Sequence, residues 1–320
     1  MAGTWIVDGH CDSIKVFEAG TRDLGVANEQ GHWDLARARQ GEVGLQFLAG
    51  FIESIYKPER AIRRGLKLIE TMHRFCEQNR EQVFPVLGKE DLNRVGTDSD
   101  PRKLGLLFAI EGGEIIGQDL FMVDIIYRLG IRSLGLTWNQ RNALADGVGE
   151  KDTGSRLTQL GVEVIGRMNE LGMLVDVSHL NEAGFWHVLE VSGQPVAATH
   201  SCAKSLCAHP RNLHDQQLRA LARQGGVVGV NFYPGFLAES GPVGRHDVVK
   251  HIVHIAEVAG TEVIGLGSDF DGIESTPDGL ETVTKLPLLV SDLVAAGFSQ
   301  SEVEGICHQN FMRLLRKVLK

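Results

Sequence analysis

The stretch Trp5 to Asp12 reads WIVDGHCD and indicates the first strand of a sheet. Its apolar lead, Trp5 to Val7, runs directly into His10 and Asp12. Side chains two residues apart on a strand point to the same face, so His10 and Asp12 can reach one point. The pair is therefore a candidate half of a metal site. Short H-x-D strings also arise by chance, so the hypothesis requires further ligands elsewhere in the chain.

Seven further apolar stretches follow, and after a first loop they alternate with helical patterns. This rhythm predicts a parallel sheet, and eight such units favour a closed (β/α)8 TIM barrel of the α/β class over an open doubly wound sheet. No G-x-G-x-x-G string follows the first stretch, which weakens a dinucleotide-binding alternative. We expect one domain over residues 1–320, with strands within residues 5–12, 44–52, 103–113, 131–139, 172–179, 195–200, 226–234 and 262–272.

The segments between these strands are typical of amphipathic helices. Between residues 58 and 79 the apolar residues fall three or four apart, and Pro58 suits a helix start. A short helix is expected just before residue 44. Further helices are expected at residues 119–130, 155–171, 181–191, 215–224 and 246–259, and two more close the chain. Residues 13–30 are polar and contain several glycines, which predicts a long loop, and such loops are often functional.

Barrel enzymes build their active sites at the carboxyl ends of the strands. Here those ends carry residues that commonly bind metals, and they come from five different strands. Seven other histidines, His251 among them, lie in loops or on helices and are interpreted as surface or capping residues. A strand-end carboxylate can also cap the next helix, and a lone histidine can be a hydrogen-bonded core residue. The candidate ligands are His10, Asp12, Glu111, His179, His200 and Asp269.

Three imidazoles and three carboxylates suit zinc or a similar divalent ion. They are too many for one tetrahedral zinc, but two ions that share a bridging carboxylate would use them all. Such a centre lowers the pKa of bound water to roughly 7 and polarises a carbonyl, and a neighbouring carboxylate can take and return a proton. Asp8, Asp176 and Asp271 also lie near strand ends, where we expect them to support a ligating histidine.

Composition narrows the class of protein. The formal charge of −9 is spread along the 320 residues, which argues against nucleic-acid binding. No apolar run in the sequence is long enough to span a bilayer. Five cysteines without a C-x-x-C pair suit free thiols in a reducing compartment. We therefore expect a cytoplasmic protein that does not associate with membranes.

Seven strings occur in this order along the chain: DGHCD, LFAIEGG, LTWNQRNALADG, VDVSH, ATHSCAKSLCAHPRN, VNFYPGF and IGLGSDFDG. In these strings and their order, the chain resembles the membrane dipeptidase (renal dipeptidase) family of zinc metallopeptidases, within the amidohydrolase barrel enzymes. The resemblance covers nearly the whole chain and implies a single metallohydrolase domain with two zinc ions per subunit, bridged by Glu111. His10 and Asp12 would hold the first ion, and His179 and His200 the second.

The resemblance also implies roles in catalysis. Asp269 would contact the first metal ion and act as general base and then general acid beside the bridging Glu111. Arg211, after the sixth strand, matches the family arginine that engages the substrate, and its guanidinium fork suits a carboxylate. An arginine beside Pro210 could equally have a structural role.

Two departures from the family pattern concern the substrate and the membrane. Familiar mammalian members carry a histidine that contacts the substrate at the position of Trp138. We expect Trp138 to form an apolar wall of the substrate pocket instead. The C-terminal string FMRLLRKVLK predicts an amphipathic helix without a hydrophobic tail signal, so no lipid anchor is expected.

These features together predict a metallo-dipeptidase that hydrolyses the amide bond of dipeptides, including L,D-dipeptides. A metal-bridging hydroxide would attack the carbonyl, and Asp269 would carry the proton to the leaving amine. Two alternatives stay open: a related hydrolase of another small amide or lactone, and a non-catalytic barrel that binds a ligand. A homodimer is an expectation from the resemblance alone.

Overall fold

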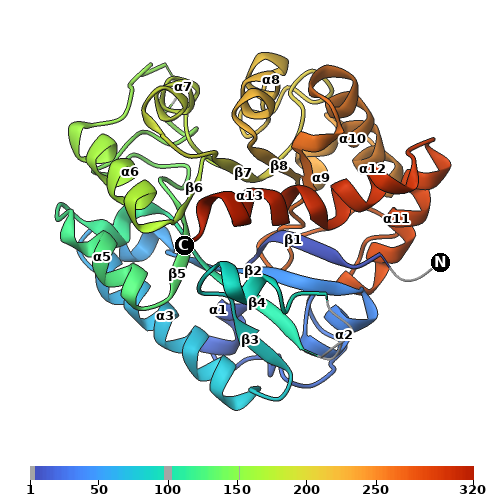
Figure 1. Ribbon diagram of the computed structural model, residues 1–320, viewed down its shortest axis with the longest axis horizontal. Helices are drawn as coiled ribbons and strands as arrows, with labels where there is room; N and C mark the ends of the chain where they lie inside the picture. Colours follow the sequence, from blue (N-terminus) through green and yellow to red (C-terminus); the bar gives the residue numbers. More distant parts are fainter. Residues whose placement is uncertain (1–3, 97–102, 151) are drawn as a thin grey trace.

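The computed structural model describes residues 4–96, 103–150 and 152–320, whose strands form one parallel sheet that closes on itself (Figure 1). Eight strands follow one another in the order β2-β1-β9-β8-β7-β6-β5-β4, and β2 also pairs with β4, which completes the barrel. The predicted (β/α)8 TIM barrel is confirmed. The described strands are β1 (Ile6–Cys11), β2 (Val43–Phe51), β3 (Val83–Pro85), β4 (Leu104–Glu111), β5 (Ile131–Gly135), β6 (Leu174–Asp176), β7 (Ala197–Ser201), β8 (Val227–Val230) and β9 (Ile264–Leu266).

Helices surround the barrel and connect successive strands (Figure 1). The seven helices expected between strands correspond to α2, α3, α5, α6, α7, α8 and α10. Within the described ranges, no helix is both long and apolar enough to cross a bilayer. The helices are α1 (Ile14–Glu18), α2 (Leu35–Gln40), α3 (Ala61–Gln78), α4 (Lys89–Leu92), α5 (Phe121–Arg128), α6 (Gln159–Leu171), α7 (Glu182–Val191), α8 (Asp215–Gln224), α9 (Pro234–Leu237), α10 (Arg245–Ala259), α11 (Leu286–Ala295), α12 (Gln300–Glu304) and α13 (Asn310–Val318).

Polar capping residues define where the helices on one side of the barrel begin and end. The Thr158 side chain accepts a hydrogen bond from the backbone N–H of Gly161 at the start of α6. Asn181 does the same for Gly184 at the start of α7. Such caps satisfy backbone donors that have no partner within the helix. At its other end α6 stops at Gly172, whose φ of 83° glycine adopts without steric cost.

The N-terminal end of the barrel is closed by α13, which crosses the strands in Figure 1. A Cβ atom on Gly9 or Gly265 would lie 2.7 or 2.4 Å from the Phe311 ring, so only glycine leaves room for this ring. Apolar packing of this kind makes this end of the barrel a solid core. With Phe311, Leu314 and Leu315 of α13, the cluster contains Val7, Leu45, Phe47, Leu107, Leu174, Ala197 and Val227 from the strands.

Three elements differ from the sequence expectation. The additional strand β3 pairs with the start of β4, and β5 joins the same edge only from Phe108 onward. A three-residue strand is too short to show a period. The expected loop at residues 13–30 begins with α1, which buries Ile14 and Phe17. The last expected helix is divided by a π-helical segment, Gly305–Gln309, between α12 and α13.

Candidate metal centre

The six candidate ligands converge at the C-terminal end of the barrel. His10 lies within β1, Asp12 directly follows it, Glu111 is the last residue of β4, and His200 lies in β7. Five of the side chains are buried, and that of Asp269 is 14% exposed. Because parallel strands all end at the same rim, residues far apart in the sequence meet here. The fold therefore brings the six residues together, as the sequence predicted.

His179 and Asp269 were expected at strand ends, but β6 and β9 stop earlier and both residues lie three positions beyond them, in loops. Their backbones adopt left-handed conformations, with φ of 66° and 63°. Non-glycine residues rarely adopt this conformation, because Cβ crowds the backbone there. Such residues gather at functional sites, where the surrounding structure holds them in place. Although both residues lie in loops, each is close to another candidate ligand, His179 to Glu111 and Asp269 to His10.

Glu111 lies between two groups of ligands and directs one carboxylate oxygen at each. Its Oε1 atom is 2.7 Å from His179 Nε2 and 3.4 Å from His200 Nε2. Its Oε2 atom is 3.7 Å from His10 Nε2, which is itself 3.3 Å from Asp12 Oδ2. In each group the ligand atoms lie within 4.8 Å of one another. This arrangement suits a carboxylate shared by two metal ions.

The rings of His179 and His200 face each other through nitrogens that carry lone pairs. Their Nε2 atoms are 2.9 Å apart. His179 Nδ1 lies 2.8 Å from Asn139 Oδ1, which can only accept, so the ring proton lies on Nδ1. Burial lowers the pKa of His179 to about 3, and the Arg211 cation adds to this shift. Burial also lowers the pKa of His200, so both rings are neutral, which is the form that binds metals.

The second group, around His10, contains buried atoms without hydrogen-bond partners. Among the described residues no group hydrogen-bonds His10 Nε2 or Asp12 Oδ1. Burial alone would lower the pKa of His10, but the nearby carboxylates, Glu111 foremost, raise it to about 10. Burial raises the pKa of Asp269 to about 7, and Asp12 and Glu111 act in the same direction. Crowded carboxylates and unpartnered donor atoms fit divalent cations, and the residues present therefore fit the two-ion hypothesis.

Asp269 is held by a contact that the sequence did not indicate. Its Oδ2 atom accepts a hydrogen bond of 2.9 Å from Asn231 Nδ2, and its Oδ1 atom lies 4.0 Å from His10 Nε2. Asn231 directly follows β8, within the string VNFYP. Its position after a strand is the available signal in the sequence, but an asparagine amide is a weaker metal ligand than a histidine or carboxylate.

A cavity of about 360 Å3 opens beside the ligands, in the range typical of small-molecule sites. Trp138 forms part of its wall, as expected, with its ring 5.1 Å from that of Phe51 and 6.0 Å from that of His179. Sequence reasoning did not identify the other aromatic residues. The lining residues are Asp12, Lys15, Phe51, Glu111, Trp138, Asn139, His179, His209, Arg211, Tyr233, Phe236, Asp269, Gly272, Ile273 and Glu274.

Arg211 also lines this cavity, although only 4% of the residue is exposed. Its guanidinium donates to the backbone oxygen of His200 at 3.0 Å and to Ser201 Oγ at 3.3 Å. Its Nε atom has no hydrogen-bond partner in the described part of the chain. The side chain is therefore fixed against β7 with one donor unused, so the geometry is compatible with both of the roles expected for Arg211, structural and substrate-binding.

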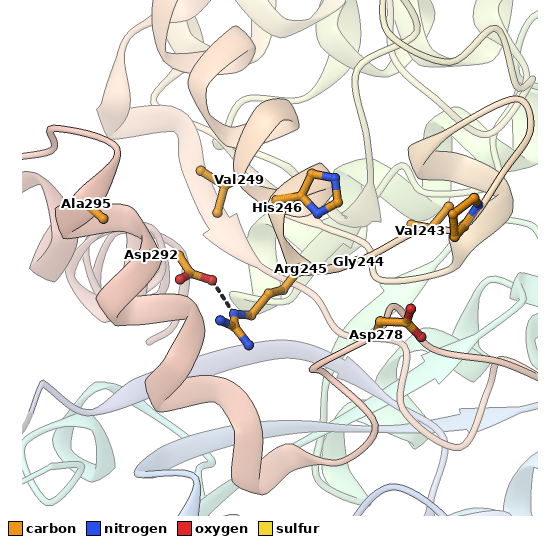
Figure 2. A pocket seen from close by; sticks show the side chains of 9 residues that line it. Val243, Gly244, Arg245, His246, Val249, Asp278, Asp292 and Ala295 are labelled. Carbon is orange, nitrogen blue, oxygen red and sulfur yellow. Dashed lines mark hydrogen bonds and ion pairs between the residues drawn. The ribbon is translucent and has the colours of Figure 1, made fainter.

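A larger hollow of about 610 Å3 lies elsewhere, at the start of α10 (Figure 2). Arg245 forms an ion pair with Asp292 across it, and His246 and Asp278 lie nearby. None of the six candidate ligands lines this hollow. Its size alone does not make it the functional site, because the convergent donors lie at the smaller cavity.

The three further aspartates have different surroundings from one another. Asp8 accepts from Ser268 and Gln46, and Asp271 accepts from the side chains of Ser13 and Arg22. Neither hydrogen-bonds a ligating ring, so the expected support of a histidine is wrong for these two. Asp176 lies close to His200 and is considered below. His251, expected to be a surface or capping residue, is buried, and its ring bonds to the backbone N–H of Ala203 and the backbone oxygen of Leu237.

The sequence matches the family described as membrane dipeptidase (peptidase family M19) over residues 1–320. Dipeptidase 3 of Mus musculus is 32% identical over 98% of this chain, which spans only 64% of that relative's length. An uncharacterized dipeptidase of Schizosaccharomyces pombe is 35% identical over 89% of this chain and 72% of its own length.

A solved structure gives the same picture for the fold. A metallopeptidase from Rhodobacter sphaeroides, bound to a phosphinate mimic of the dipeptide L-Ala-D-Ala, superposes with a TM-score of 0.91 at 28% identity. The match covers 98% of this chain and 99% of that one. The ordered strand-end motifs, the barrel and the full-length family match agree, and the chain belongs to the membrane dipeptidase family, peptidase family M19.

Proposed function

We propose that this protein is a zinc-dependent dipeptidase that hydrolyses the amide bond of dipeptides, including L,D-dipeptides. The observation that carries the proposal is the position of Glu111, whose two carboxylate oxygens face two separate groups of metal-binding side chains. The family supports hydrolysis of a dipeptide. The Rhodobacter relative, which binds a mimic of L-Ala-D-Ala, supports the extension to a D-residue at the second position.

The residues that would hold the ions are the six predicted ones. His10 and Asp12 would bind one ion, His179 and His200 the other, Glu111 both, and Asp269 the first. Two bound divalent ions would supply Lewis acidity that lowers the pKa of a coordinated water to roughly 7 and polarises a carbonyl group. The remaining requirements, which are substrate orientation and proton transfer, fall to the chain's own side chains.

Asp269 would move the proton during hydrolysis, and its contacts support this role. Asn231 occupies its Oδ2 atom, so the carboxylate is held in one orientation with Oδ1 toward His10. Asp269 also lines the cavity, where a substrate amide would lie. A fixed carboxylate beside the reacting bond can accept a proton and deliver it to the leaving amine.

Arg211 and Trp138 would orient the substrate. The unpartnered Nε of Arg211 and the rest of its fork suit the C-terminal carboxylate of a dipeptide. A buried cation in the wall of a cavity of about 360 Å3 would favour short peptides whose carboxylate reaches it. Trp138, packed on Phe51, would form the apolar wall beside the side chain of the substrate.

Metal content measured alongside hydrolysis of a panel of L,L- and L,D-dipeptides tests the proposal. We expect about two zinc equivalents per chain and turnover of at least part of the panel. Turnover confined to other small amides or lactones would instead support the related-hydrolase alternative. Two bound ions with no turnover of any such substrate would support the non-catalytic barrel.

Replacement of Trp138 tests the aromatic wall. In Trp138→Ala the loss of apolar contact should lower kcat/KM by roughly 10- to 200-fold, most for dipeptides with large apolar side chains. The same panel of dipeptides measures this, with Trp186→Ala, on the outer helix α7, as the control. If kcat/KM stayed unchanged across the panel, the wall would have no part in substrate choice.

Cellular location and assembly complete the proposal. All five cysteines are free, which supports a reducing cytoplasm. A homodimer is proposed on the family resemblance alone. Cell fractionation tests the location, and light scattering of the purified protein tests the assembly.

A further inference from the structure

Behind His200, on the side away from Glu111, lies a short chain of hydrogen bonds through Thr199 to Asp176. Thr199 and His200 are neighbours in β7, and Asp176 is the last residue of the adjacent strand β6. All three side chains are buried. We propose that Thr199 and Asp176 are positioning residues that hold the His200 ring with its Nε2 lone pair toward the metal centre. This inference rests on the two-ion site proposed above.

Counting protons along this chain decides which way each hydrogen bond runs. Thr199 Oγ1 lies 2.6 Å from Asp176 Oδ2, and a carboxylate can only accept, so the single hydroxyl proton points to Asp176. Thr199 Oγ1 is also 2.9 Å from His200 Nδ1. With its own proton committed, the hydroxyl must accept there, and His200 carries its proton on Nδ1. The lone pair of this ring is therefore on Nε2, the atom nearest Glu111 and His179.

Asp176 is anchored firmly enough to act in this way. Its Oδ1 atom accepts from the backbone N–H groups of Ser178 at 2.9 Å and Thr199 at 3.0 Å. Both carboxylate oxygens are thus occupied, by donors from β7 and from the loop after β6. A carboxylate behind a ligating imidazole fixes the ring orientation and raises its basicity. His179 has a neutral amide, Asn139, in the corresponding place, so the two rings of one ion site are supported differently.

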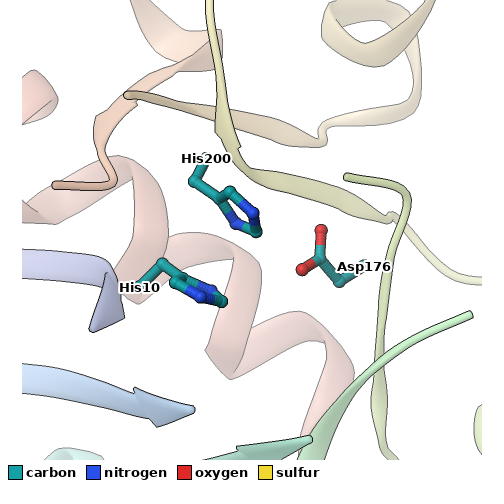
Figure 3. Close-up of side chains that lie close together, drawn as sticks. All are labelled: His10, Asp176 and His200. Carbon is teal, nitrogen blue, oxygen red and sulfur yellow. The ribbon is translucent and has the colours of Figure 1, made fainter. Parts of the chain in front are cut away.

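A competing interpretation treats Asp176 as a metal ligand. Ligand atoms of His10, Asp176 and His200 lie within 4.8 Å of one another, and Figure 3 shows the carboxylate facing the two rings. The hydrogen bonds to both oxygens of Asp176 oppose this interpretation, because coordination would compete with them. Direct ligation needs the carboxylate itself, whereas the positioning role needs the Thr199 hydroxyl as well. The two roles therefore respond differently to a change at Thr199.

Thr199→Val removes the hydroxyl and keeps the shape of the side chain, and Thr199→Ser keeps the hydroxyl. Thr137→Val is the matched control, because Thr137 is also buried and its hydroxyl has no partner in the described residues. Each protein would be stripped of metal and titrated with zinc against a chromophoric chelator. Circular dichroism of the metal-free proteins reports on folding.

In Thr199→Val we expect the affinity for one of two zinc equivalents to fall by about 10- to 100-fold, with the other equivalent retained. Thr199→Ser should restore the lost affinity, and Thr137→Val should bind as the unaltered protein does. Two unchanged equivalents in folded Thr199→Val would overturn the proposal. If Asp176→Asn lost a zinc equivalent while Thr199→Val kept both, Asp176 would be a direct ligand and the proposal would be wrong. The proposal would also be wrong if the unaltered protein bound no zinc. Normal zinc titrations without dipeptide turnover would refute the proposed function alone.

Discussion

The two ends of the barrel are built from the same strands but contain opposite kinds of side chain. At the N-terminal end, Phe311 and its neighbours on α13 fill the interior with apolar contacts. At the C-terminal end, the same strands lead into buried histidines and carboxylates beside a cavity. Apolar burial stabilises a fold, whereas buried charges crowded together do not. The side chains that stabilise the fold and the candidate metal-binding side chains therefore lie at opposite ends of the barrel axis. Substitutions at each end test this separation.

The largest effect is expected from Asp269→Asn at the C-terminal end. Loss of the carboxylate that we propose transfers the proton should lower kcat by about 10²- to 10⁴-fold. Asparagine tolerates the left-handed conformation at φ 63°, so the fold should persist. Steady-state kinetics on zinc-loaded protein measure the first effect and thermal melting the second. Full activity in this variant would contradict the proposed role of Asp269 in proton transfer.

At the opposite end, Phe311→Ala should act on stability alone. Removing a fully buried ring should reduce the free energy of unfolding by about 3–5 kcal/mol, whereas kcat/KM per folded molecule should stay the same. Urea denaturation measures the change, and Phe121→Ala, where the residue is 60% exposed, is the control. A matching loss of activity in the folded fraction would show that the two ends are not independent.

Arg211→Lys, at the C-terminal end of the barrel, tests whether Arg211 binds the substrate or only supports the structure. The ammonium cannot reproduce the fork, so one charged hydrogen bond, about 1.5–3 kcal/mol or roughly 10- to 150-fold in kcat/KM, should be lost on dipeptides. Dipeptide amides, which lack the carboxylate, should show little difference between the two proteins. An equal loss on both substrate types would assign Arg211 to structure, through its bonds to His200 and Ser201.

The smallest effect is expected from Gly265→Ala in the apolar end. The new Cβ would lie 2.4 Å from the Phe311 ring, and overpacking of this kind should cost about 1–3 kcal/mol of stability. Gly166→Ala is the control, because no other atom lies within 4 Å of its Cβ position and α6 should gain up to about 1 kcal/mol there. Equal stability of the two variants in urea would contradict the tight packing around Phe311.

The sequence was informative where chemistry follows directly from a strand. The apolar run before Glu111 identified the strand that carries this residue. The place of Glu111 at the end of that run indicated that it lies at the C-terminal end of the barrel. Thr199 and Asn139 gave no such signal, because their roles depend on which ring each meets across strands or loops. The period of the last helix predicted an apolar face but not the surface that it covers. Only the folded barrel shows that Phe311 fills its N-terminal end.

The left-handed backbones at His179 and Asp269 have a consequence for the evolution of this protein. Each conformation costs of order 1–3 kcal/mol in a non-glycine residue, and glycine or asparagine would adopt it more readily. A selection for heat resistance alone would therefore favour replacing these two residues with glycine or asparagine. Variants with these replacements would be more stable but would lack two of the six candidate metal ligands. At positions 179 and 269, selection for stability and selection for the proposed activity would therefore favour different residues.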